Sequence, residues 1–231
     1  MLAFQINNKD SKKCMLRLFT LFTCLLLVSV PVFAARERLA YFTVEPSDLW
    51  AYWLLFLMPV GLAFSPIKSD RTINHILWAI VGLLCILFIG LRYNVGGDWD
   101  NYLGYLDRAR LTEFSFTDAL SVSWGNALGY MFINSLALKL GGGIYFVNTF
   151  CATIFIVGLV KYCRKQPIPW IALAVAIPYM VCAVAMGYTR QSAAIGFFLI
   201  GLSILRPGNE LKYFVLILLG AFFHLSVIVT L

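Results

Sequence analysis

Charge is what this 231-residue sequence has least of. Charged residues make up 13% of the chain and apolar residues 61%, whereas a soluble domain carries about 25% charge. Stretches without a formal charge recur along the chain, and several approach the roughly 20 residues that a helix needs to cross a bilayer. These features exclude an ordinary soluble domain. They predict an all-α fold, a polytopic transmembrane helical bundle.

Residues that bind metals or react in redox chemistry are also scarce. The sequence has two His and six Cys residues, and it contains no C-x-x-C motif. The Cys residues lie within or beside apolar runs, where we expect them to act as small packing residues. No basic run is interleaved with aromatic residues, which argues against a nucleic-acid partner. We therefore expect no cofactor, no metal and no nucleic acid.

The apolar runs predict about seven membrane spans. They are Leu18–Ala35, Leu49–Ile67, Thr72–Leu91, Leu140–Val160, Gln166–Thr189, Gln191–Leu205 and Tyr213–Leu231. The first run follows a basic N-terminus and ends in small residues, so residues 1–40 are either an uncleaved span or a signal-like segment. Residues 41–231 then form the membrane domain. Because the last run ends at Leu231 without a basic tail, we expect a C-terminally shortened sequence; an intact end at the membrane is the alternative.

The side of the membrane on which the polar segment 92–143 lies can be predicted from the distribution of basic residues that each topology gives. If residues 124–140 lie in the interface, 11 of the 18 basic residues fall on the cytoplasmic side. If that stretch crosses the membrane, only 8 do. Since short cytoplasmic loops retain basic residues, we predict that 92–143 is an extracytoplasmic loop with an interfacial helix.

Three places in this scheme hold unusual polar residues. The stretch from Arg92 to Tyr102 follows the third predicted span and contains paired Gly residues, Asp98 and three aromatics. Arg can bind phosphate with two parallel hydrogen bonds, Asp can act as a general base, and aromatic rings stack on sugars or anchor a helix end among headgroups. The pair Asp98 and Asp100 could instead hold a divalent cation, although no third ligand adjoins it.

The other two places lie late in the chain. Arg190 is the only charge in the forty residues from Gln166 to Leu205, which suffice for two crossings joined by a tight turn near residues 186–188. An Arg at the centre of a span costs roughly 2.5–3.5 kcal/mol, so Arg190, with Gln191, predicts either an anion clamp or an Arg that reaches the headgroups. His224 is the only ionisable side chain after Lys212. It is either a packing residue or a third member of the site.

These motifs, in this order, resemble the EpsG family of Wzy-like polysaccharide polymerases. The resemblance rests on Gly90-Leu91-Arg92, Val95-Gly96-Gly97-Asp98 with Tyr102, Arg190-Gln191 and a later His224. Trp99 departs from the family, which often has another aromatic there, and the chain is shorter than usual members. The resemblance covers about Leu49 to Leu231.

The resemblance implies a glycosyltransferase of the bacterial inner membrane. It would join undecaprenyl-diphosphate-linked repeat units into O-antigen, capsule or exopolysaccharide, without a metal. Arg190 would stabilise the departing diphosphate with help from Arg92, Asp98 or His224 would be the base, and Tyr102 and Gln191 would orient the sugar. A flippase and a chain-length regulator would be its partners. The alternatives are a polyprenyl-phosphate-sugar-dependent transferase and a transporter or flippase of lipid-linked sugars.

Overall fold

A computed structural model describes residues 49–66, 70–111 and 128–230 of the protein. Over these ranges the chain consists of helices and their connections, without a strand, so the all-α prediction is confirmed there. The expectations for residues 1–40, a first span or a signal-like segment, lie outside the described residues. Residues Ala51–Leu231 group into one compact unit, which contains every feature discussed below.

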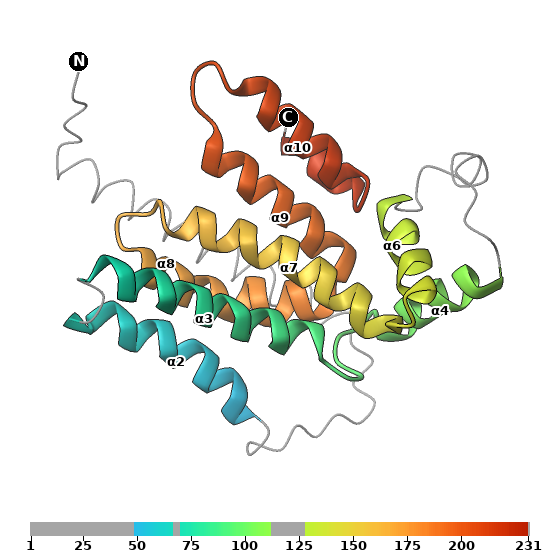
Figure 1. Ribbon diagram of the computed structural model, residues 1–231, viewed down its shortest axis with the longest axis horizontal. Coiled ribbons are helices and arrows are strands. Elements are labelled where there is room, and N and C mark those ends of the chain that lie inside the picture. Colours follow the sequence, from blue (N-terminus) through green and yellow to red (C-terminus); the bar gives the residue numbers. More distant parts are fainter. Residues whose placement is uncertain (1–48, 67–69, 112–127, 231) are drawn as a thin grey trace, which may run out of the picture. The chain divides into compact units, whose positions relative to one another are not determined.

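The helices follow the apolar runs of the sequence (Figure 1). In chain order they are α2 (Trp50–Phe64), α3 (Arg71–Gly90), α4 (Trp99–Leu111), α6 (Leu128–Lys139), α7 (Gly143–Cys163), α8 (Pro169–Ala176), the π-helix η3 (Ile177–Ala185), α9 (Thr189–Ile204), α10 (Glu210–Ala221) and the 3-10 helix η4 (Leu225–Thr230). Two of them, α3 and α7, are long and apolar enough to cross a membrane, whereas α2, the continuous α8–η3 segment and α9 are shorter apolar helices.

Local chemistry explains where several helices begin and change. The side chain of Asp70 accepts a hydrogen bond from the backbone N–H of Ile73 at 2.9 Å and so caps α3, which satisfies a donor that the first turn cannot pair internally. Pro169 opens α8, where its missing N–H costs nothing. Pro178 lies where α8 gives way to η3, because a proline inside a helix removes a hydrogen bond from the ladder.

Successive long helices run antiparallel, so their ends gather at two places. At the first, which we call the Trp170 end, the indole N–H of Trp170 donates to Asn74 at 3.2 Å and its ring stacks on Trp78 at 3.9 Å. Lys165 donates to the carbonyl of Ser203 at the same end. At the opposite end, which we call the Arg92 end, Arg92 bonds to the carbonyl of Ala185. The starts of α3 and α8 therefore share the Trp170 end, and their far ends meet at the Arg92 end.

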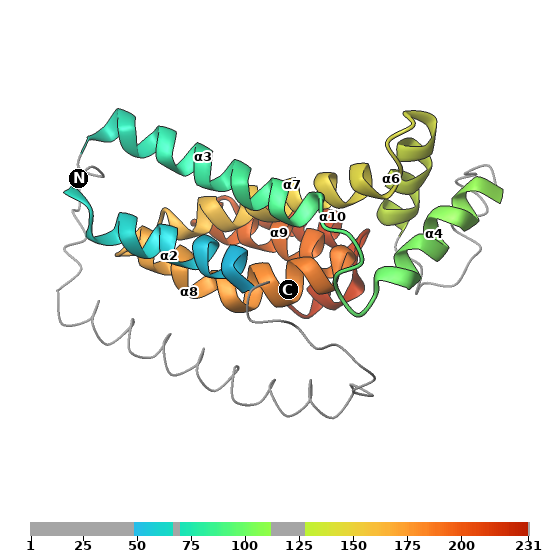
Figure 2. The ribbon, with the colours of Figure 1, turned by 90° about the horizontal axis from the view of Figure 1, so that it is seen from below.

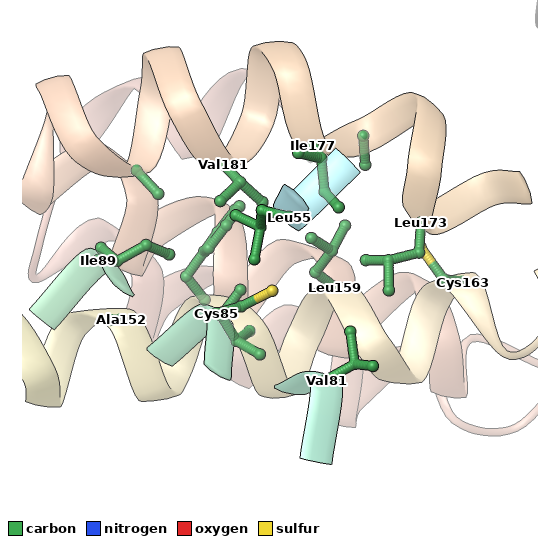
Figure 3. Packing of buried hydrophobic residues seen from close by; sticks show 14 of the residues in the cluster. Leu55, Val81, Cys85, Ile89, Ala152, Leu159, Cys163, Leu173, Ile177 and Val181 are labelled. Atoms are coloured by element: carbon green, nitrogen blue, oxygen red, sulfur yellow. The ribbon is translucent and has the colours of Figure 1, made fainter. Parts of the chain in front are cut away.

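The interior is a hydrophobic cluster between α2, α3, α7 and the α8–η3 segment (Figure 3). Its labelled members include Leu55, Cys85, Leu159 and Ile177. All of the Cys residues that the structure describes are free thiols, as expected of packing residues. The cluster fixes the helices relative to one another and thereby sets the geometry of the Arg92 end.

Helices α7 and α9 pack backbone against backbone. A Cβ atom added to Gly158 would lie 2.2 Å from the carbonyl oxygen of Gly196, and one added to Gly196 would lie 2.7 Å from the backbone of α7. Small residues at such a crossing allow two membrane helices to approach closely. This contact fixes α9, the helix that carries Arg190.

The two polar helices α4 and α6 lie together at the Arg92 end of the bundle (Figure 2). The backbone N–H of Gly129, near the start of α6, donates to the carbonyl of Phe222 at 2.8 Å, and α6 leads through Gly141 and Gly142 into the start of α7. Both ends of this 12-residue helix are thus at the same end of the bundle.

The expectation of one crossing helix through Tyr213–Leu231 is wrong for the described part. Helix α10 ends at Ala221, the chain reverses, and η4 returns along it so that the hydroxyl of Tyr213 donates to the carbonyl of Thr230 at 2.8 Å. The reversal is stabilised by His224, whose ring nitrogen Nδ1 accepts the backbone N–H of Ser226 at 3.2 Å. Hydropathy gives no sign of a turn that a single side chain stabilises.

Candidate functional site at the Arg92 end

The loop after α3 is interlocked with the turn that precedes α9. Gly96 has a φ of 102°, a region that L side chains rarely adopt. A Cβ atom at Gly96 would also lie 2.4 Å from the carbonyl oxygen of Met186 and 2.9 Å from Gly187. The paired Gly residues of the sequence therefore have different roles, since Gly97 has open space around it. Gly96 is needed because two backbone segments touch there.

Arg92 connects the loop after α3 with the turn that precedes α9. It is only 5% exposed, and its guanidinium donates to the carbonyls of Ala185 at 3.0 Å and Ile89 at 3.4 Å and to the hydroxyl of Thr189. Thr189 is linked in turn to Asn148 on α7 at 3.5 Å. Arg92 thus connects the end of α3 with both sides of the turn before Arg190. The structure places it among protein acceptors, so its direct effect is to position that turn.

The predicted turn near residues 186–188 is confirmed, because η3 ends at Ala185 and α9 begins at Thr189. This geometry puts Arg190 in the first turn of α9. Its Nη1 donates to the hydroxyl of Tyr105 at 3.1 Å, and its guanidinium carbon lies 4.9 Å from the centre of the Tyr105 ring. Cation–π contacts of this kind occur within about 6 Å of the ring. Tyr105 of α4 therefore fixes the orientation of the guanidinium.

The Nε atom of Arg190 is buried and has no hydrogen-bond partner among the described residues. None of the carboxylates in the described ranges forms an ion pair with Arg190. A buried guanidinium without an acidic partner is unfavourable unless an anion completes its environment. Arg190 is in this respect prepared for an anionic ligand.

Tyr102 lies on the buried face of α4, near Arg190. The pKa of its hydroxyl is raised to about 12, first by burial and second by the nearby carboxylate of Asp98, against the opposing charges of Arg190 and Arg92. At physiological pH this hydroxyl is therefore neutral and can donate a hydrogen bond. The Tyr102 ring also packs against Tyr130 of α6 at 5.5 Å.

Asp98 lies at the start of α4, half-buried, and accepts one hydrogen bond from the amide of Asn101 at 3.2 Å. Its carboxylate keeps further acceptor capacity. Asp100 is exposed, and the described residues contain no group of three or more potential metal ligands. Asp98 is therefore the carboxylate of this pair that reaches the site, through its neighbour Tyr102.

His224 reaches the site from the reversal after α10. The Nδ1 atom of its ring lies 2.7 Å from the hydroxyl of Ser226 and accepts the backbone N–H of Ser226 at 3.2 Å. The charge of Arg190 acts on His224, so the two side chains are neighbours although 34 positions separate them in the sequence. Gln191 is half-buried beside Arg190 and does not join the hydrogen bonds of the described site.

Electrostatic interactions therefore connect five of the six expected residues: Arg92, Asp98 and Arg190 act on Tyr102, and Arg190 acts on His224. The structure also adds residues that the sequence did not single out: Tyr105, Tyr130, Asn134, Asn148 and Thr189. Tyr130, Asn134 and Asn148 are fully buried, and each leaves one polar atom without a partner among the described residues. The sequence signal for the two Asn residues was their position within apolar runs; Tyr105 gave none.

Comparison with known proteins identifies the family of the chain. No curated protein and no solved structure matches the chain. The EpsG family model matches residues 75–231, which begin in α3 and include every residue of the site. The proteins of that family are Wzy-like polymerases, and the apolar helices agree with a membrane protein. On this match and on the order of its motifs, the chain belongs to the EpsG family.

Proposed function

We propose that the protein is a multi-pass polymerase of the bacterial inner membrane that joins undecaprenyl-diphosphate-linked repeat units into a surface polysaccharide. The observation that supports this best is the placement of Arg190. Two distant parts of the chain, α4 and the reversal after α10, approach it, and none of the described carboxylates forms an ion pair with it. A diphosphate is the anion that a departing lipid carrier would bring to such a side chain.

The distribution of basic residues supports a membrane orientation with the site on the outer face. The Trp170 end carries the basic residues near the helix ends there: Arg71, Lys161, Arg164, Lys165, Arg206 and Lys212. Basic residues near helix ends are retained on the cytoplasmic side. The Arg92 end then faces outward, with α4 and α6 as its interfacial cap.

In the proposed reaction, a hydroxyl oxygen of one repeat unit bonds to the anomeric carbon of another chain's reducing-end sugar. The bond from that carbon to the diphosphate oxygen breaks, and the electron pair leaves with the lipid diphosphate. Arg190 would stabilise the charge that grows on the leaving group, which is commonly the largest single term in such catalysis. Tyr102, neutral and buried, would donate to a sugar or phosphate oxygen, and Gln191 would orient the sugar.

The proton of the attacking hydroxyl requires a base. Of the two candidates, His224 has its Nδ1 engaged by Ser226, so this nitrogen is not available to accept the proton. Asp98 accepts one hydrogen bond from Asn101 and retains free lone pairs. These contacts favour Asp98 as the base. A flippase that delivers the repeat units and a chain-length regulator would be the partners of the protein.

The test is the chain-length distribution of surface glycan in a deletion strain complemented with variants. We expect the deletion to leave single repeat units exposed outside the cell, Arg190→Ala to behave like the deletion, and Arg190→Lys to restore part of the polymer because it keeps the charge. Arg164→Ala, at the Trp170 end, is the matched control and should restore full chain length. If Arg190→Ala polymerises normally at equal expression, Arg190 is not the leaving-group residue. Substrate retained on the cytoplasmic leaflet would indicate a transporter instead.

A further inference from the structure

The Tyr105 ring that orients Arg190 belongs to a cluster of three tyrosines from two helices. The centre of the Tyr130 ring, on α6, lies 5.5 Å from that of Tyr102 and 5.7 Å from that of Tyr105, both on α4. Aromatic rings attract each other when their centres are roughly 4.5–7 Å apart, and the edge-to-face arrangement of Tyr105 and Tyr130 is one of the preferred geometries. One ring of α6 therefore contacts both tyrosines of α4.

Both α4 tyrosines also act on Arg190. They are three positions apart and so lie on one face of the helix. The hydroxyl of Tyr105 accepts a hydrogen bond from Nη1 of Arg190 at 3.1 Å, and its ring lies under the guanidinium carbon at 4.9 Å. The hydroxyl of Tyr102 interacts with the backbone N–H of Arg190. This face of α4 thus controls both the backbone and the side chain of Arg190.

Tyr130 is the fixed member of the cluster. It is 0% exposed, and its carbonyl accepts the side-chain amide of Asn134 at 2.7 Å. The preceding residue, Gly129, donates its backbone N–H to the carbonyl of Phe222 at 2.8 Å, and a Cβ atom on Gly129 would lie 3.1 Å from the same oxygen. The hydroxyl of Tyr130 has no hydrogen-bond partner among the described residues. Its contacts with α4 are therefore made by the ring, from a position anchored on the reversal after α10.

We propose that Tyr130 is a positioning residue, whose ring holds Tyr102 and Tyr105 against Arg190 and so sets the orientation of its guanidinium. This inference rests on the proposed function, which assigns the leaving group to Arg190. A catalytic group must be held within about 0.5 Å of its productive place by side chains that packing locks. Tyr130 supplies that packing from α6, so the interfacial cap contributes to turnover through Arg190.

The position of Arg190 matters most when charge grows on the departing diphosphate. An interaction that strengthens only in the transition state affects kcat, whereas one that binds the substrate equally in both states affects KM. Loss of the Tyr130 ring should therefore lower kcat and leave KM nearly unchanged. General loosening of the fold would instead lower the amount of folded protein and leave kcat per folded molecule as it was.

The experiment measures kcat and KM for the full chain in lipid nanodiscs, with lipid-linked repeat units isolated from the deletion strain. Tyr130→Leu should lower kcat roughly 10–100-fold, since displacing a reacting group by 1 Å can cost about 100-fold. Tyr130→Phe keeps the ring and should retain turnover. Phe155→Leu is the matched control, because Phe155 is an equally buried aromatic residue of the hydrophobic cluster. It should lower stability by a comparable amount and leave kcat per folded molecule unchanged.

A double substitution tests the route of the effect. Because Tyr130 acts on Arg190 in part through Tyr105, adding Tyr130→Leu to Tyr105→Leu should cost much less than Tyr130→Leu costs alone. Fully additive losses in kcat would show that Tyr130 acts elsewhere and would overturn the inference. If Tyr130→Leu does not fold, Tyr130→Met, which fills more of the space without a ring, is measured with the same expectation.

The outcomes separate this inference from the proposed function. If Arg190→Ala abolishes turnover while Tyr130→Leu behaves like Phe155→Leu, Tyr130 is not a positioning residue, and the role of Arg190 stands. If Tyr130→Phe loses as much turnover as Tyr130→Leu, the hydroxyl rather than the ring is required, and the inference is wrong. If Arg190→Ala turns over normally, the assigned role of Arg190 fails, whatever Tyr130 does.

Discussion

The two ends of the helix bundle contain similar polar and aromatic residues, but they differ in how completely the polar groups are hydrogen-bonded. At the Trp170 end, two stacked indoles and a hydrogen bond to Asn74 complete the packing, and the described Arg and Lys residues there are mostly exposed. At the Arg92 end, five buried polar atoms lack a described partner: Arg92 Nε, Arg190 Nε, Tyr130 Oη, Asn134 Oδ1 and Asn148 Nδ2. Every buried side-chain polar atom without a described partner lies at this end. Proteins tolerate such atoms mainly where function requires them, so the contrast distinguishes the well-satisfied Trp170 end from the Arg92 end, where we propose the reaction.

Among the substitutions that test this comparison, Arg92→Gln should have the largest effect. Leaving the buried acceptors of Arg92 without their donor costs about 1–3 kcal/mol, and here the substitution also releases the turn before Arg190. We expect loss of polymer and a clearly lowered melting temperature. Arg164→Gln, an exposed residue at the Trp170 end, should change neither. If Arg92→Gln lost polymer without any loss of stability, direct contact with substrate would explain Arg92 better than positioning does.

Gly96→Ala should have the next largest effect. The positive φ and the carbonyl of Met186 at 2.4 Å both oppose a Cβ atom, and a strained residue of this kind costs on the order of 1–3 kcal/mol. Because the strain falls on the turn before α9, kcat should drop more than KM changes. Gly97→Ala, next to it and in open space, is the control. Equal behaviour of the two variants would refute the interlocked backbone.

Trp170→Phe tests the other end. It removes the hydrogen bond to Asn74 and part of the stack on Trp78, which together contribute about 1–2 kcal/mol. We expect a lower midpoint of thermal unfolding and unchanged polymer length per folded molecule. A selective loss of turnover at full stability would show that the Trp170 end is not merely structural.

The smallest change in stability should follow from Asn134→Leu. Asn134 donates to the carbonyl of Tyr130 at 2.7 Å, but its own oxygen has no described partner. Replacing such a group by an apolar one of similar size is nearly neutral, within about 1 kcal/mol. Polymerisation should nevertheless fall, since the Arg92 end loses a polar group. Unchanged turnover would remove Asn134 from the site.

The sequence predicted the helices well because charge-free runs report helices that are buried or in lipid. The Met186–Tyr188 turn was predictable because forty residues with a single charge are too long for one membrane-crossing helix. The reversal at His224 was not predictable, since it depends on a hydrogen bond between its ring and Ser226. Arg92 was identified correctly as unusual, but only tertiary contacts reveal that its acceptors are Ala185 and Thr189.

The contribution of the α4 residues to the site was still harder to predict from the sequence. Tyr105, Arg108 and Arg110 lie within seven positions of a polar segment, and nothing in the order of residues distinguishes them. Packing does, because α9 brings Arg190 to one side of the helix and leaves Arg110 with Asp107 on the surface. Information about partners from distant helices is absent from hydropathy and local propensity, which is why this part of the site required coordinates.

The crossing of α7 and α9 at Gly158 and Gly196 acts as a pivot. Backbones in direct contact leave no side chains to slide past one another, so the helix cannot shift along its axis at that point. Arg190 lies six residues before Gly196, which corresponds to about 9 Å along the axis of α9 at the rise of an α-helix. Substrate entry and product exit must then be accommodated by tilting this short segment of α9 or by moving α4, while the rest of the bundle stays still.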